Sequence, residues 1–314
     1  MRDSGVGSLR VLTFAGIRLL QAVPTILLIL IVVFALVRLS GDPATLVLGD
    51  WASAEQVEAL REEWGLSDPL PVQFGRYLWG VLHGDLGESL RYHRPVSEMI
   101  VERFPASAQL ALVAIALSML VGIPVGVVAA SRWRSLADLT VRLSVAIGQA
   151  IPRFYLGTLL IVVFGLWLKW LPAGGYGSAA RLILPAVTMA TPTVVLLARL
   201  TRSSVLDALH KDYVRTARSK GIREGVILYR HVLRNALIPP LTMIGMEAAL
   251  MFGQAVVVET VFSWPGLGRL AMNAVYTRDF PVLQGVVMAF CMLTVVAGIL
   301  VDVLYAVVDP RIRY

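Results

Sequence analysis

The sequence predicts an all-α membrane protein with six transmembrane helices, and three observations carry that prediction. Hydrophobic residues make up 57% of the 314 residues, and the mean hydropathy is +0.73. The apolar residues gather in six long runs, and a helix of about 20 residues is enough to cross the hydrocarbon core of a bilayer. Basic residues gather in alternate connections between the runs, as they do on the cytoplasmic side of membrane proteins. This composition excludes a soluble globular domain.

The first run, residues 19–37, follows Arg2, Arg10 and Arg18. As a helix it would be about 28 Å long, which is enough for one span. The run is too long for the core of a secretory signal peptide, and a polar turn follows it instead of a small-residue cleavage site. We therefore expect a retained span with the N-terminus in the cytoplasm.

Residues 40–106 form an extracytoplasmic segment in this prediction. Between residues 40 and 103 there are eleven acidic residues and five arginines, a net charge of −6. Residues 55–64 have the pattern of a short helix that Ser53 caps and that Gly65 and Pro69 end. The acidic charge favours the outer side, because basic segments are retained in the cytoplasm.

Five further runs complete the expected bundle. Residues 107–130 form a span in which Gly122 and Gly126 allow a bend or close helix packing. Residues 140–170 would be about 45 Å long as one helix, so we expect Pro152 to kink a single broken span. The other spans are residues 182–200, 237–258 and 283–308. The predicted parts are therefore a tail with the first span (1–39), the outer segment (40–106) and a five-helix core (107–314) that includes a polar loop (201–236).

The distribution of charge agrees with this topology. The expected inner segments, 1–18, 131–142, 199–234 and 309–314, together carry +11. The expected outer segments, 40–103, 169–181 and 260–283, together carry −3. Six spans place both termini of this multi-pass protein on the cytoplasmic side of the plasma membrane. The pI of about 9.8 then reflects these inner segments in contact with membrane lipid, and we expect no nucleic-acid partner.

The loop between the fourth and fifth spans has nine basic and three acidic residues between positions 199 and 234. Leu206, Leu209, Tyr213 and Ala217 follow at steps of three and four residues and predict one apolar helix face. Gly221 ends that helix, because glycine tolerates the left-handed turn past a helix end. A second stripe follows at Ile222, Val226, Tyr229, Leu233 and Leu237. The loop is either a docking element for another protein or a solvated basic loop that only fixes the orientation of the chain.

Several stretches carry a family resemblance. The loop contains DYVRTARSKG and RHVLRNALIP, which place Ala217, Gly221, His231 and Leu233 at the spacing A-x3-G-x9-H-x-L. The same resemblance is carried by further stretches, at residues 84–90 (GDLGESL), 94–96 (RPV), 256–285 and 301–314. The chain resembles the permease subunits of ABC importers, and its loop resembles the variant of the oligopeptide and dipeptide branch. Arg215 and Arg234 depart from the Glu and Pro of the general family pattern but fit that branch.

The resemblance implies a cytoplasmic coupling helix at residues 210–222, seated in a cleft of a separate ATPase subunit. The implied coupling residues are Tyr213, Arg215, Thr216, Ala217, Arg218, Lys220 and Gly221. The implied partners are a second homologous permease subunit, two ATP-binding subunits, a solute-binding protein at the outer face and a di- or oligopeptide cargo. Nickel chelates, haem and glutathione are alternative cargoes, and the outer segment is alternatively a packed lid with no partner.

The sequence has no G-x-x-x-x-G-K-[ST] phosphate loop, so we expect ATP and Mg²⁺ to bind in the partner subunits. We expect no cofactor, no catalytic residue and no metal site in this chain, because the four histidines lack metal-ligand spacing. Two other classes are alternatives. An ion-gradient-driven secondary transporter would need a buried ion site and inverted halves. An intramembrane enzyme would need a Ser/His or Asp/Asp pair at one depth.

Polar residues at membrane depth are the candidates for the substrate path, because such residues are costly in hydrocarbon unless they face a cavity or a partner. They are Gln149, Arg153, Glu247 and Gln254. The alternative is a structural hydrogen bond or ion pair between helices. The loop before the last span supplies a candidate outer gate at Phe262, Trp264, Pro265 and Gly266. In it Phe262 and Trp264 would lie at the membrane interface, and the loop would either gate or plug the outer mouth.

Overall fold

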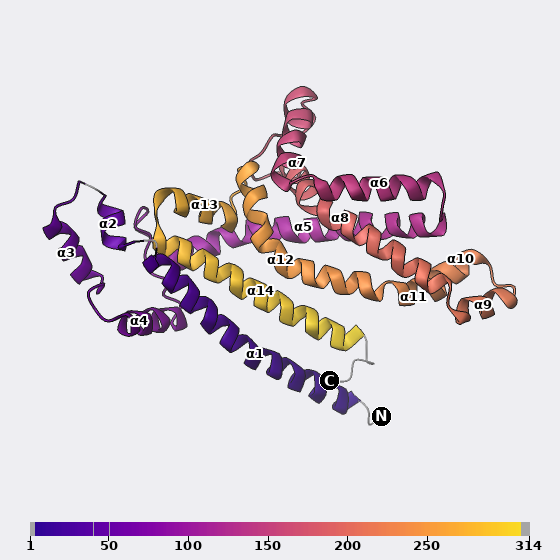
Figure 1. The fold of residues 1–314 in the computed structure, drawn as a ribbon, viewed down its shortest axis with the longest axis horizontal. Coiled ribbons are helices and arrows are strands. Elements are labelled where there is room, and N and C mark those ends of the chain that lie inside the picture. The colour runs from indigo at the N-terminus through magenta and orange to yellow at the C-terminus, as the bar shows by residue number, and fades with distance from the viewer. Residues whose placement is uncertain (1–3, 40, 50, 309–314) are drawn as a thin grey trace. The chain divides into compact units, whose positions relative to one another are not determined.

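The structure is a computed structural model that describes residues 4–39, 41–49 and 51–308. Within these ranges the chain is helical apart from turns and loops, and they contain no β-strand (Figure 1). The elements are α1 (Ser4–Leu39), α2 (Pro43–Leu48), α3 (Ala54–Glu63), α4 (Leu70–Leu82), α5 (Val96–Ser131), α6 (Leu136–Ala150), α7 (Arg153–Leu160), the π-helix η1 (Ile161–Trp167), α8 (Ala179–Leu209), α9 (Asp212–Ser219), α10 (Glu224–Val226), the π-helix η2 (Ile227–Val232), α11 (Leu233–Ala236), α12 (Ile238–Val261), α13 (Leu267–Thr277) and α14 (Phe280–Val308).

Five helices of the described chain are long and apolar enough to cross a membrane, namely α1, α5, α8, α12 and α14. A sixth crossing depends on the segment after α5. There Asp138–Ala150 and Arg153–Trp167 form a pair of helices bent by 104°, with Pro152 at the break. The all-α membrane class is therefore confirmed, with five candidate spans, or six if the bent pair is counted as one span. The bend is far sharper than a kink, because η1 and α7 start a new helical direction after Pro152.

The described chain groups into two compact units. Unit 1 comprises residues 1–107 and 265–314, and unit 2 comprises residues 108–264. In unit 1, α14 packs along α1, so the last helix groups with the first (Figure 1). The sequence division assigned α14 to the five-helix core at 107–314, and the contacts group it differently. Apolar side chains of α5, α13 and α14 form the core of unit 1, with Val96, Leu267 and Val286 fully buried.

A buried carboxylate ties the loop before α5 to the start of α14 in unit 1. Ser89 Oγ donates a hydrogen bond of 2.5 Å to Asp279, and the backbone N–H of Leu90 donates to the same carboxylate at 3.3 Å. Asp279 is only 2% exposed. The helix at residues 55–64 is confirmed as α3. Ser53 and Gln56 form a reciprocal capping box at its start.

In unit 2, α5 approaches α8 closely at two glycines. A Cβ on Gly122 would lie 2.9 Å from the backbone oxygen of Val194, and one on Gly126 would lie 2.5 Å from the backbone oxygen of Ala198. Both separations are shorter than a carbon and an oxygen tolerate. The two glycines, four residues apart, therefore lie on the face of α5 that meets α8, so the sequence prediction of close helix packing is confirmed.

Candidate functional site

The polar loop between α8 and α12 folds into a short surface helix, α9. Helix α8 ends at Leu209, where the ring Nδ1 of His210 lies 2.7 Å from the carbonyl oxygen of Leu206. Lys211 is extended, with φ −75° and ψ 153°, and α9 begins at Asp212. The single helix that the sequence predicted from Leu206 to Ala217 is therefore wrong. A turn at 210–211 separates α8 from α9 and lets α9 run in a different direction.

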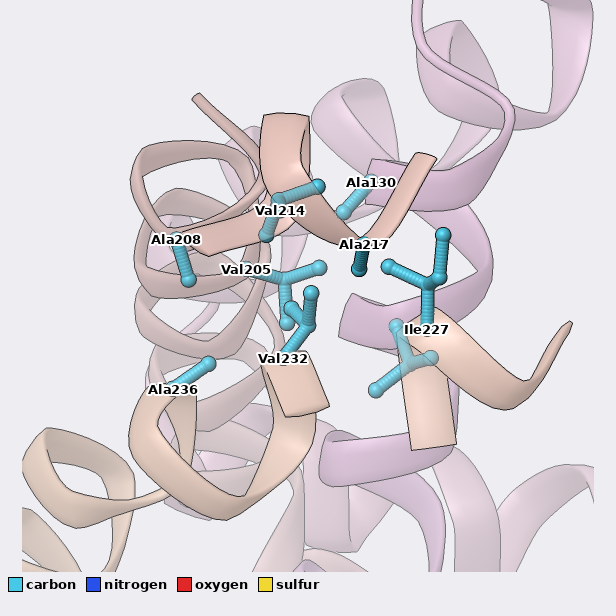
Figure 2. Close-up of a cluster of buried hydrophobic side chains, with 9 residues drawn as sticks. Ala130, Val205, Ala208, Val214, Ala217, Ile227, Val232 and Ala236 are labelled. Atoms are coloured by element: carbon cyan, nitrogen blue, oxygen red, sulfur yellow. The ribbon is translucent and has the colours of Figure 1, made fainter. Parts of the chain in front are cut away.

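One face of α9 packs on the ends of α5, α8, η2 and α11 (Figure 2). Val214 is fully buried and Ala217 is 7% exposed. Their side chains point at Val205 of α8 and at Ala130 of α5, and Ile227 and Val232 close the cluster from η2 (Figure 2). The buried cluster consists of Val127, Ala130, Val205, Ala208, Val214, Ala217, Ile227, Val232 and Ala236. These short side chains let α9 lie close to α8 and α5.

The other face of α9 is exposed. Tyr213 is 39% exposed, and Arg215, Thr216, Arg218, Lys220 and Gly221 are exposed as well. Six of the seven predicted coupling residues therefore share one accessible surface. Ala217 is the exception, because it lies on the buried face and seats the helix on its own chain. Val214, which the sequence stripe did not select, is the second seating residue.

Gly221 ends α9 in the way that the sequence predicts. Its φ is +71°, in the left-handed region. The N–H of Gly221 donates to Arg218 O at 3.0 Å and that of Ile222 donates to Ala217 O at 3.3 Å, which is the Schellman pattern of helix ends. Ile222 packs against the buried cluster. The turn therefore fixes both the end of α9 and the direction in which the chain leaves it.

An ion pair bridges the turn after α9. Arg218 donates to the Glu224 carboxylate at 2.7 Å from Nε and at 3.2 Å from Nη2. This hydrogen bonding lowers the pKa of Glu224 and raises the pKa of Arg218. Both side chains are solvent-accessible, so the pair orients the loop more than it stabilises the protein.

The second predicted stripe is also displaced. Tyr229 is 71% exposed and Val226 is 43% exposed, whereas Ile227, Val232 and Ala236 are buried. The cause is η2, because a π-helical turn contains an extra residue and shifts the positions that share a face.

Three of the four predicted membrane-depth polar residues lie on two packed helices of unit 2. Arg153 Nη2 of α7 donates to Gln254 Oε1 of α12 at 2.6 Å. Glu247 precedes Gln254 by two helical turns on α12, and its carboxylate lies within electrostatic range of the Arg153 guanidinium. The Nε of Arg153 is buried without a hydrogen-bond partner. Gln149 lies on the other side of the 104° bend, on α6, and its side chain is exposed.

The predicted outer-gate residues divide between the two units. Phe262 and Trp264 are each only 1% exposed in unit 2, so both side chains are packed inside the protein. The ring of Tyr176 meets Trp264 edge-on with centroids 4.8 Å apart, and the N–H of Gly175 donates to Phe262 O at 2.9 Å. The loop at 174–176 therefore covers them. In unit 1, Pro265 is half-buried and Gly266 is buried as the residue before α13.

The sequence did not reveal an ion pair close to the polar loop between α8 and α12. Asp138, only 1% exposed, receives hydrogen bonds from Arg202 Nε at 2.5 Å and from Arg202 Nη2 at 3.0 Å. The pair joins α6 to α8. The only local signal is the Ser135 cap, whose Oγ accepts from the Asp138 N–H. Among the described residues no group of three His, Cys, Asp or Glu side chains could hold a metal ion.

Comparison with known proteins assigns the chain to a family. Residues 122–314 match the family described as "Binding-protein-dependent transport system inner membrane component", and residues 11–111 match its N-terminal companion. A Brucella abortus (strain 2308) protein named as a permease of a peptide transport system is 44% identical over 306 residues, covering 95% of this chain and 98% of that protein. The glutathione transport system permease protein GsiC of Pectobacterium atrosepticum is 42% identical over 301 residues, covering 95% and 97%.

Solved structures share the fold at low sequence identity. The MetNI methionine ABC transporter in an inward-facing conformation matches with a TM-score of 0.58 at 18% identity, covering 67% of this chain and 96% of that one. An amino acid ABC transporter matches with a TM-score of 0.52 at 17% identity, covering 67% and 94%. With the family model matching more than half of its residues, the chain belongs to the inner-membrane permease components of binding-protein-dependent transport systems.

Proposed function

We propose that this chain is one permease subunit of an ATP-driven importer for di- and oligopeptides. The observation that carries the proposal is α9. It is a short helix with a polar accessible face, and a buried face of Val214 and Ala217 seats it on two long helices. Family membership and a relative named for peptide transport support the cargo class.

In this proposal the translocation pathway is completed by a second, homologous permease. Two ATP-binding subunits hold ATP and Mg²⁺, and each receives one coupling helix in a surface cleft. Tyr213, Arg215, Arg218 and Lys220 present the aromatic and cationic contacts on this chain. Closure of the ATP-binding subunits moves α9, and α8 carries the motion into the membrane because α9 is packed directly on its end.

The proposed topology places both termini and α9 in the cytoplasm and residues 40–106 outside. The net charge of +6 between residues 199 and 234 and of −6 between 40 and 103 supports it. A solute-binding protein delivers the cargo to the outer side, where residues 262–266 close the mouth of the pathway. The pathway is lined by Arg153, Glu247 and Gln254, and Gln149 lies near the bend between α6 and α7.

Uptake by the assembled importer tests the function. The chain is produced together with a second permease, two ATP-binding subunits and a solute-binding protein of the same transport system. Labelled trialanine is then offered to membrane vesicles. We expect uptake that requires ATP and that survives a protonophore. Uptake that stops with the protonophore and continues without ATP would instead identify a gradient-driven transporter. A cysteine at Ser219, on the exposed part of α9, should crosslink to an ATP-binding subunit, whereas one at Ser67 should not.

Glutathione is a second candidate cargo. The relatives that are 42% identical are named for glutathione transport, and glutathione is itself a tripeptide with one γ-linkage. Competition distinguishes the two, since an importer for ordinary peptides should be inhibited by unlabelled trialanine far more than by unlabelled glutathione.

A further inference from the structure

Unit 1 contains a cavity of about 660 Å³ that no part of the proposed transport mechanism uses. Its wall is formed by the last turns of α1, by α3 and α4, by residues 88–90 and 93 of the following loop and by the first turn of α14. This volume is typical of sites for small molecules, which enclose about 300–1,000 Å³. The wall combines aromatic and aliphatic side chains with a few polar ones, which is also typical of such sites.

Two buried polar atoms in this wall lack a hydrogen-bond partner. Gln73 of α4 is 7% exposed, and its Nε2 donates to Leu66 O at 2.8 Å and to Asp68 O at 2.7 Å. Both amide hydrogens are thereby used, which fixes the orientation of the amide and leaves Oε1 as a buried acceptor without a donor. Arg38 of α1 presents the opposite case, because its Nε is a buried donor without an acceptor.

The charges of the wall are also mixed. The Arg38 guanidinium lies over the ring of Phe34, with 5.2 Å from Cζ to the ring centroid. Glu63 and Glu88 contribute carboxylates to the same wall. Burial raises the pKa of Tyr77 to about 12, so its phenol is protonated at physiological pH and can donate a hydrogen bond. A ligand that satisfies this wall carries an anionic oxygen and an ammonium group with N–H donors.

We propose that the cavity binds the headgroup of a zwitterionic phospholipid that carries a primary ammonium. Its phosphate oxygen meets Arg38, and its ammonium donates to Gln73 Oε1 and faces Glu63 and Glu88. The phosphate of such a lipid supplies the anionic oxygen that Arg38 lacks, because a guanidinium binds phosphate through charge-assisted hydrogen bonds. The proposal concerns the chain itself and stands whether or not the transport function is correct.

An apolar stripe on α1 that leads away from the cavity favours a lipid over a soluble zwitterion. Leu27, Ile31, Phe34 and Arg38 follow one another at steps of four, three and four residues and share one face of α1. Leu27 is 41% exposed and Ile31 is 45% exposed, and both belong to the candidate span Leu20–Leu39. This face offers an acyl chain an apolar path that leads to Arg38. A peptide or amino acid would use the polar wall but would have no use for the stripe.

Native mass spectrometry of the purified full-length chain tests the proposal with three lipids of identical acyl chains. Phosphatidylethanolamine has both the phosphate and the N–H donors, phosphatidylcholine lacks the donors, and phosphatidylglycerol lacks the cation. We expect retention to decrease in that order. Arg38→Gln should weaken phosphatidylethanolamine binding about tenfold, which corresponds to the loss of one charge-assisted hydrogen bond. Arg91→Gln is the matched control, because Arg91 is exposed and does not line the cavity.

Three outcomes overturn the proposal. The first is equal retention of phosphatidylethanolamine and phosphatidylglycerol. The second is unchanged phosphatidylethanolamine binding in Arg38→Gln. The third is that alanyl-alanine binds the delipidated chain and displaces the lipid. The last outcome would assign the cavity to a soluble zwitterion. If Arg38→Gln fails to fold, Arg38→Lys keeps the charge and should retain the preference for phosphatidylethanolamine. The first outcome is measured on the wild-type chain and needs no variant.

Discussion

At the scale of single residues, Gly221 decides how the chain leaves α9. Its left-handed backbone permits the two hydrogen bonds that close α9, and a Cβ at this position would have no atom within 4 Å. The requirement is therefore conformational and not steric. A side chain that disfavours positive φ changes the turn, whereas one that tolerates it does not.

Replacing Gly221 by valine should separate ATP hydrolysis from uptake in the assembled importer. A β-branched residue in the left-handed region costs about 1–2 kcal/mol or more, so the turn opens and α9 loses its fixed exit. Gly221→Asn is the matched control, because asparagine tolerates this conformation. Uptake per ATP hydrolysed, measured at equal membrane levels, should fall for valine and stay near the wild-type value for asparagine. Equal coupling in both variants would contradict a role for the turn.

The Arg218–Glu224 pair should make the turn after α9 sensitive to acid. Because Arg218 lowers the pKa of Glu224, the pair stabilises the loop at pH values above the ordinary glutamate pKa of about 4.3. That stabilisation is lost as the pH falls through the lowered pKa. A spin label at Gly225→Cys, in the Cys291→Ser background, should have constant mobility between pH 6 and 8 and higher mobility in acid. With Glu224→Gln the mobility should be high at every pH.

At the scale of elements, the contact of α5 with α8 depends on the absence of side chains. Gly126 faces the backbone of α8 so closely that a methyl group would have to push the two helices apart. Adding volume at such a contact costs about 1–3 kcal/mol, because the helices cannot relax independently. The helix gains little in return from a residue with higher intrinsic propensity.

Gly126→Ala should therefore lower the thermal stability of the purified protein. Gly253→Ala is the control, because Gly253 also lies within a helix but has no atom within 4 Å of its Cβ position. Alanine there should be neutral or raise stability by about 0.5–1 kcal/mol through helix propensity. The measurement is the melting temperature of each variant and of the wild-type protein in the same detergent. A Gly126→Ala protein as stable as the Gly253→Ala protein would refute close packing.

The same elements show how far sequence reasoning reaches. Apolar runs predicted the long helices, and Gly221, Ser53 and the Gly122–Gly126 pair behave as their residue types require. The apolar stripes predicted for the polar loop do not match the faces that are buried in the structure, because the prediction assumed an unbroken α-helix. The turn at 210–211 resets the phase before α9, and η2 changes the period after it. The Asp138–Arg202 and Ser89–Asp279 pairs join residues 64 and 190 positions apart, and nothing in a single sequence identifies such distant partners.

At the scale of the whole molecule, topology is the property that links the loop to the outer segment. The two regions carry opposite net charge, and each has an exposed serine that can be replaced by cysteine for chemical labelling. The protein has one cysteine, Cys291, so a cysteine-free background needs a single change. The orientation can therefore be read from two engineered positions.

Ser67→Cys and Ser219→Cys, each in the Cys291→Ser background, should react differently with a membrane-impermeant maleimide. We expect residue 67 to be labelled in intact spheroplasts and residue 219 only after the membrane is permeabilised. Positive charge in the loop is the physical reason, because basic segments are retained in the cytoplasm. Labelling of both residues in intact cells would contradict the proposed topology.

The cluster beneath α9 has a mechanical consequence. It consists of four alanines, four valines and one isoleucine. Alanine has no rotamer to change, and a β-branched side chain has few, so the cluster cannot yield by rearranging its side chains. A displacement of α9 should then be transmitted to the ends of α5 and α8, on which it packs. The rigidity of this contact comes from small residues. Longer side chains such as methionine could change rotamer and would absorb part of the displacement.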